Sequence, residues 1–147
     1  MIKIPPPILV LILITSNYFS QNRLEIIYLP YKNSTSFLIL LVGSLILINT
    51  VFKFIKSKTT VNPVKFKKVN KLVTSGTYKY SRNPMYLGMI LIIISTSIFY
   101  LNYFSVVTPF IFYFWINRFQ IKREEIFLKE KFGEEYLSYM SKTRRWI

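Results

Sequence analysis

Long uncharged runs alternate with charged segments along this chain. Residues 4–22 and 33–52 contain no charged side chain, and neither do residues 83–117. A helix of about 20 apolar residues crosses a hydrocarbon core of roughly 30 Å, so each of the first two runs predicts one membrane-spanning helix. The third run is too long for one crossing and fits two. A hairpin would turn in its middle, at Ser95–Ser97 and then Asn102.

The pattern therefore predicts an all-α integral membrane bundle that forms a single domain, residues 1–147. We expect four spans near residues 4–22, 33–53, 84–101 and 103–118. A linker, residues 54–83, follows the second span, and the spacing of apolar residues predicts an amphipathic tail helix over residues 119–141.

The charge distribution orients these spans. The chain has 20 Lys and Arg against 6 Asp and Glu, a net charge of +14. Residues 53–82 hold nine basic side chains and no acidic one, and residues 118–147 hold eight basic and five acidic ones. Because basic loops next to spans stay on the cytoplasmic side, we expect the linker and the tail there. An even number of crossings then places the N-terminus, with Lys3, on the same side.

Two alternatives bear on this topology. Lys3 followed by an apolar run resembles a signal peptide, but Pro5–Pro7 precede the run and no small-residue cleavage site follows it, which favours a retained span. A large basic excess is also typical of nucleic-acid binding. A nucleic-acid binder needs no apolar runs of spanning length, so we expect a lipid bilayer as the partner and no nucleic acid.

Cysteine and histidine are both absent. Their absence excludes disulfides, thiolate or imidazole metal ligands, and Ser-His-Asp triads, and we expect no metal site. Chemistry must come from Arg, Lys, Glu, Tyr or Asn, or from a bound cofactor.

The start of the third span is the first candidate site. Pro84 begins the helix, and a helix N-terminus attracts carboxylate or phosphate groups. Arg82 adds a fixed positive fork just before it. Arg82 could equally anchor the helix to lipid phosphate, and Gly88 is a residue type common where membrane helices pack.

The tail supplies the second candidate. Its apolar stripe has helical spacing and consists of Ile121, Glu125, Leu128, Phe132, Tyr136 and Tyr139. A carboxylate on such a face is costly unless a cation meets it. Lys129, four residues after Glu125, is the simplest partner for a solvated ion pair.

Three pieces of the chain together resemble the isoprenylcysteine carboxyl methyltransferase family, within the wider group of phospholipid N-methyltransferases. They are Ile4-Pro5-Pro6-Pro7, then Gly76-x-Tyr78-x-x-Ser81-Arg82-Asn83-Pro84-Met85-Tyr86-x-Gly88, and finally Glu124-Glu125-x-x-Leu128-x-x-x-Phe132-Gly133-x-x-Tyr136-x-x-Tyr139. The similarity covers most of the chain from Thr59 onward.

The resemblance implies a membrane methyltransferase that binds S-adenosyl-L-methionine at the cytoplasmic interface. It implies catalytic roles for Arg82 and Glu125. The residues that it places against the cofactor are Tyr80, Arg82, Asn83, Tyr86, Gly88, Glu124 and Glu125. Asn83 stands where many relatives have His, which puts a general-base role at this position in doubt.

The methyl acceptor expected from this architecture is lipophilic or small, with a carboxylate, amine or thiol as the reacting group. Two other functions remain open from the sequence. One is a membrane reductase similar to sterol reductases, with a nicotinamide cofactor. The other is a non-catalytic transporter or scaffold, although all six acidic residues lie outside the four predicted spans, where a cation exporter would need one inside.

Overall fold

The computed structural model describes residues 4–21, 28–56 and 72–147. These residues form helices and connecting turns, with no β-strand among them. The longer helices are α1 (Pro6–Phe19), α2 (Lys32–Lys56), α3 (Pro84–Tyr100), α4 (Tyr103–Ile116) and α5 (Lys122–Lys142). A short 3₁₀ turn, η2 (Gly76–Lys79), precedes α3, and a π-helical segment, η3 (Asn117–Ile121), joins α4 to α5.

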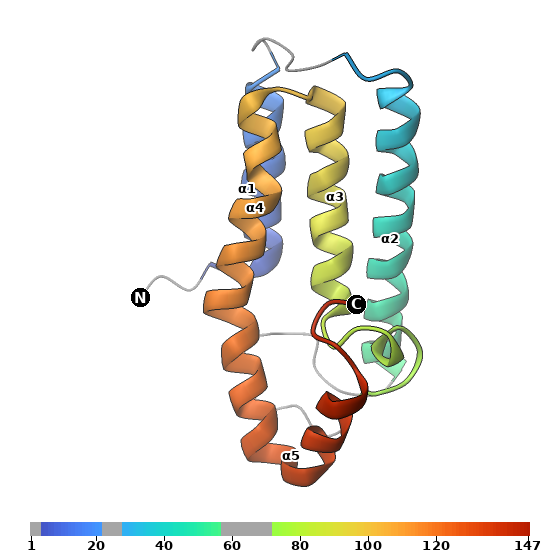
Figure 1. Ribbon diagram of the computed structural model, residues 1–147, viewed down its shortest axis with the longest axis vertical. Helices are drawn as coiled ribbons and strands as arrows, with labels where there is room; N and C mark the ends of the chain where they lie inside the picture. The colour runs from blue at the N-terminus through green and yellow to red at the C-terminus, as the bar shows by residue number, and fades with distance from the viewer. Residues whose placement is uncertain (1–3, 22–27, 57–71) are drawn as a thin grey trace.

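The first four helices stand side by side and alternate in direction (Figure 1). α2 packs along α3, and α1 packs against both α3 and α4. α4 continues through η3 into α5, which extends below the bundle and then turns back toward the start of α3 (Figure 1). The prediction of an all-helical bundle is confirmed.

Local sequence explains where these helices begin. Pro6 and Pro84 each occupy a first-turn position, where a missing N–H costs nothing. The α3–α4 hairpin turns at Leu101, which has a left-handed backbone (φ 41°), and Asn102. The Asn102 side chain accepts from the Ser105 N–H, and the Ser105 hydroxyl accepts from the Asn102 N–H, which forms a capping box. Ser95–Ser97 lie inside α3, so the turn comes at the later of the two predicted positions.

One helix among the described residues, Lys32–Lys53 within α2, is long and apolar enough to cross a membrane by length and composition. α1 and α3 are apolar but shorter, with 14 and 17 residues. α1 is also shorter than the predicted span of residues 4–22. Four crossings with cytoplasmic termini therefore remain a prediction, and half of the predicted linker, residues 57–71, lies outside the described residues.

The bundle interior combines an apolar core with hydrogen bonds between helices. The core residues of α1, α3, α4 and η3 are Leu9, Val10, Leu13, Tyr86, Met89, Ile93, Phe112, Ile116 and Ile121. Near the hairpin, the fully buried Asn17 donates to the Thr96 hydroxyl at 2.9 Å and accepts from the Thr108 hydroxyl at 3.1 Å. These bonds link three helices and satisfy a buried amide.

Two glycines set the distance between α2 and α3. A Cβ atom on Gly88 would lie 2.9 Å from the Gly43 carbonyl oxygen, and one on Gly43 would lie 2.9 Å from the Leu91 Cβ. Neither contact is sterically tolerable, so the two backbones approach this closely only because both residues are glycine.

The tail helix differs from the single helix predicted over residues 119–141. It contains a break at Gly133, where φ is 48° and ψ is −123°, a conformation that favours glycine. The break reverses the chain, and the second part of α5 returns toward η2 (Figure 1). There the Tyr139 hydroxyl donates to the Tyr78 carbonyl oxygen at 2.7 Å.

Candidate functional site

Three segments meet at the end of the bundle where α3 begins. They are the loop from η2 into α3, the first turns of α5, and the residues after α5, which we call the closing segment (residues 143–147) (Figure 1). The two candidates that the sequence suggested, Arg82 and the tandem glutamates, lie together here although they are more than 40 residues apart in the chain.

Glu125 is the centre of a cluster with two arginines. The Arg82 Nη2 lies 3.0 Å from its Oε1, and the Arg145 Nε and Nη2 lie 3.0 Å and 2.7 Å from Oε1 and Oε2. The side chains of Arg82 and Glu125 are only 10% and 11% exposed, whereas that of Arg145 is 35% exposed. A carboxylate this buried requires cationic partners, and the two guanidinium groups supply them.

Backbone carbonyls fix the Arg82 side chain. Its Nη1 donates to the carbonyl oxygens of Met140 and Thr143 at 3.2 Å and 3.1 Å. Its Nε–H is buried and has no hydrogen-bond partner among the residues that the structure describes. An unpaired buried donor on a cation has a cost that an anionic or carbonyl ligand at this point would remove.

Glu124 has different surroundings from its neighbour. Its Oε1 accepts from the Tyr86 hydroxyl at 2.5 Å and from the Gln120 amide at 2.7 Å. Burial raises the pKa of Glu124 from 4.5 to about 7, against the opposing effect of the hydrogen bonds from Tyr86 and Gln120. The two adjacent carboxyls therefore have different partners: Glu125 faces two cations, and Glu124 faces two neutral donors.

The remaining predicted site residues lie in varied places. Asn83 is buried, and its side-chain amide donates to the Arg145 carbonyl at 3.0 Å. Tyr80 is 76% exposed, and Gly88 faces α2 in the close contact with Gly43. The structure thus joins Arg82, Glu125 and Arg145 in one cluster and Tyr86 with Glu124 in another, while the packing against α2 accounts for Gly88 without a ligand.

Two residues of the site had not been predicted from the sequence. Arg145, and not the exposed Lys129, is the second partner of Glu125. Gln120 contacts Glu124 from one turn earlier on the same helical path. The basic pair Arg144–Arg145 is the signal that could have identified the first, because a glutamate on an apolar stripe requires a cation.

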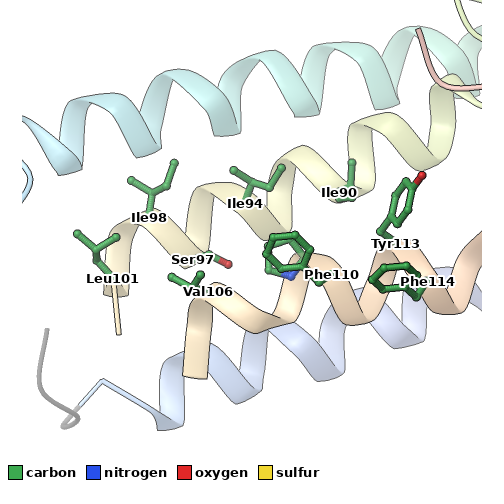
Figure 2. Close-up of a pocket in the computed structure, with 10 residues that line it drawn as sticks. Ile90, Ile94, Ser97, Ile98, Leu101, Val106, Phe110, Tyr113 and Phe114 are labelled. Carbon is green, nitrogen blue, oxygen red and sulfur yellow. The ribbon is translucent and has the colours of Figure 1, made fainter. Parts of the chain in front are cut away.

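An apolar pocket of about 510 Å³ lies between α3 and α4 (Figure 2). It is lined by Ile90, Ile94, Ser97, Ile98 and Leu101 of the α3 side and by Val106, Pro109, Phe110, Tyr113 and Phe114 of α4. Tyr113 packs against Trp146 of the closing segment, with ring centroids 5.3 Å apart. The pocket and the polar site are therefore neighbours through these two rings.

Comparison with known proteins supports the resemblance seen in the sequence. The phospholipid methyltransferase family matches residues 34–135. A probable protein-S-isoprenylcysteine O-methyltransferase of Oryza sativa subsp. japonica is 35% identical over 91 residues, 60% of this chain and 46% of that protein. The protein-S-isoprenylcysteine O-methyltransferase of Saccharomyces cerevisiae is 42% identical over 73 residues, 49% of this chain and 30% of that protein.

A shorter relative, an uncharacterized protein of Haemophilus influenzae, is 43% identical over 63 residues, which cover 43% of this chain and all of that protein. The chain spans less than half the length of the rice and yeast relatives. The matched residues 34–135 include most of α2, all of α3 and α4, and the tandem glutamates. The chain therefore belongs to the phospholipid methyltransferase family.

Proposed function

We propose that this protein is an S-adenosyl-L-methionine-dependent methyltransferase of the membrane interface. The observation that carries the proposal is the pairing of Arg82 with Glu125, beside Tyr86 with Glu124, at the start of α3. Family membership supplies the reaction class, and this cluster supplies groups of both charges at one site.

The residues present fit such a cofactor. The free Nε–H of the buried Arg82 is a donor suited to the carboxylate of the methionyl group. The carboxylate of Glu124 suits the ammonium group of the methionyl part. Its two described hydrogen-bond donors, Tyr86 and Gln120, are neutral, so neither neutralises its negative charge. Glu125 is already bonded to two arginines, so we assign it the role of holding Arg82 in place.

The bound cofactor would supply an electrophilic methyl group for direct displacement by the acceptor. That reaction requires neither a metal nor a protein nucleophile, which suits a chain without Cys or His. The protein's contribution is to hold the reactants in line and to exclude water. The closing segment, which covers the start of α3, is suited to exclude water.

The acceptor that we propose is lipophilic or small and reacts through a carboxylate, amine or thiol. The apolar pocket along α3 and α4 supports a lipophilic one, because its Tyr113 end adjoins Trp146 of the closing segment. The names of the rice and yeast relatives point to the carboxylate of a prenylated cysteine as the first compound to test. In this proposal the protein is a multi-pass membrane protein with its site on the cytoplasmic side.

Calorimetric titration of S-adenosylmethionine and S-adenosylhomocysteine into the detergent-purified protein tests the proposal. Arg82→Ala should weaken binding by about tenfold or more, since it removes a charge-assisted contact with the cofactor worth roughly 1.5–3 kcal/mol. Glu125→Gln should weaken binding by about tenfold, because Arg82 loses the charged partner that holds it in place. Lys56→Ala, an exposed residue at the end of α2, should bind like the wild type. A folded wild-type sample that binds neither compound would overturn the proposal.

A further inference from the structure

The closing segment is tied to the start of α3 by its backbone. The Arg144 carbonyl accepts from the Arg82 N–H at 3.0 Å. The Arg145 carbonyl accepts from the Asn83 amide at 3.0 Å and from the Ser81 hydroxyl at 3.4 Å. On its other side, Trp146 packs on Tyr113 of α4. The segment therefore bridges α3 and α4. These backbone hydrogen bonds and the ring contact fix the position of the Arg145 backbone, from which its side chain extends toward Glu125.

The Arg145 side chain donates two hydrogen bonds to the Glu125 carboxylate. Its Nε and Nη2 reach the two different oxygens of the carboxylate, while Arg82 reaches only Oε1. The hydrogen bond to Glu125 also raises the pKa of Arg145. A single contact leaves a carboxylate free to rotate, whereas a two-point contact with a planar guanidinium fixes its plane.

We propose that Arg145 is a positioning residue, which orients the Glu125 carboxylate so that Glu125 in turn holds Arg82 toward the cofactor. This inference rests on the proposed function. Arg145 acts through Glu125 and makes no contact with the cofactor itself. Its contribution to cofactor affinity must therefore disappear when Glu125 can no longer accept a charge-assisted bond.

Lysine cannot replace arginine fully in this role. Its ammonium is a point charge without the fork that meets both carboxylate oxygens. Arg145→Lys should therefore keep the charge and part of the contribution to cofactor affinity, and Arg145→Ala should lose both. Arg144 offers a matched control, because it is the adjacent arginine, its side chain is exposed, and its contact with Arg82 uses only backbone atoms.

The test is titration of S-adenosylhomocysteine into the wild type and into Arg145→Ala, Arg145→Lys, Arg144→Ala, Glu125→Gln and the double variant Arg145→Ala/Glu125→Gln. We expect about tenfold weaker binding for Arg145→Ala, since a misplaced Arg82 loses part of one charge-assisted hydrogen bond to the cofactor. We expect an intermediate loss for Arg145→Lys and none for Arg144→Ala. In the Glu125→Gln background, Arg145→Ala should cause no further loss.

Other outcomes overturn the inference in distinguishable ways. If the wild type binds and Arg145→Ala binds equally well or more tightly, Arg145 does not position Glu125. An equal loss in both backgrounds would show that Arg145 acts independently of Glu125. If the wild type itself does not bind, the proposed function fails and this inference falls with it. Should Arg145→Ala not fold, Arg145→Lys decides, because it keeps the charge at position 145 but not the planar fork: binding as tight as that of Arg144→Ala would overturn the inference.

Discussion

Ionisation of Glu124 should make the stability of this protein fall as the pH rises from acid to neutral. The perturbation is Glu124→Gln, which keeps an oxygen to accept from the Tyr86 hydroxyl and cannot ionise. Burial raises the pKa of Glu124 from 4.5 to about 7. At about 1.4 kcal/mol for each pKa unit, the ionised form costs up to roughly 3 kcal/mol in the folded protein. Because Glu124 is partly exposed, we expect about 2 kcal/mol.

The sign of this effect follows from the direction of the pKa change. Below about pH 4.5 the Glu124 carboxyl is protonated in both the folded and the unfolded chain, so its ionisation makes no difference between the unfolding free energies of wild type and variant. Between there and about pH 7 only the unfolded chain ionises, and the wild type loses stability relative to Glu124→Gln. Above pH 7 both states are ionised, and the difference becomes constant. With no histidine or cysteine in the chain, few other side chains titrate in this range.

The assay is reversible denaturant unfolding in detergent micelles at intervals from pH 4.5 to 8, followed by tryptophan fluorescence. The quantity of interest is the difference in unfolding free energy between wild type and Glu124→Gln. Glu130→Gln, at an exposed position on the same helix, is the control and should run parallel to the wild type. Parallel curves for Glu124→Gln as well would refute the reasoning and place the Glu124 carboxyl in contact with water.

Two further predictions concern the glycines that shape the fold. Gly88→Ala should lower the free energy of unfolding by about 1–3 kcal/mol, since its methyl group would meet the Gly43 carbonyl and force α2 away from α3. Thermal unfolding measures this, and an unchanged midpoint would mean that the two helices are not in close contact. Gly133→Ala should cost a similar 1–3 kcal/mol for a different reason: a Cβ meets nothing within 4 Å there, but the backbone conformation is strained for alanine. A variant as stable as wild type would indicate that α5 continues straight through Gly133.

The helical bundle could be predicted from the sequence because apolar runs and helix starts are local properties. The ends of α3 and the turn before α4 followed from Pro84 and Asn102, whose effects on the backbone do not depend on distant residues. The break at Gly133 could not be found in this way. The apolar stripe of the tail keeps its helical spacing across that residue, since Leu128 and Phe132 before the break and Tyr136 and Tyr139 after it pack in one cluster with Leu72.

The sequence predicted Arg82 and Glu125 as site residues but did not predict that Arg145 pairs with Glu125. The unusual position of Glu125 on an apolar stripe indicated a buried charge that needed a cation, and the resemblance pointed to Arg82. Sequence spacing favoured Lys129 because it is a neighbour on an ideal helix. The reversal at Gly133 brings Arg145 back to Glu125 instead, and such a return depends on tertiary structure.

The most direct test of the proposed function follows the methyl group itself. The purified protein is incubated with S-adenosylmethionine carrying a radiolabelled methyl group, together with a prenylated cysteine analogue or with phospholipid vesicles, and the label in the lipid phase is counted. The proposal predicts label transfer to at least one acceptor by the wild type and by Lys56→Ala, and a loss of transfer with Glu125→Gln. Transfer that is equal in Glu125→Gln, or no transfer and no cofactor binding by a folded wild type, would contradict it.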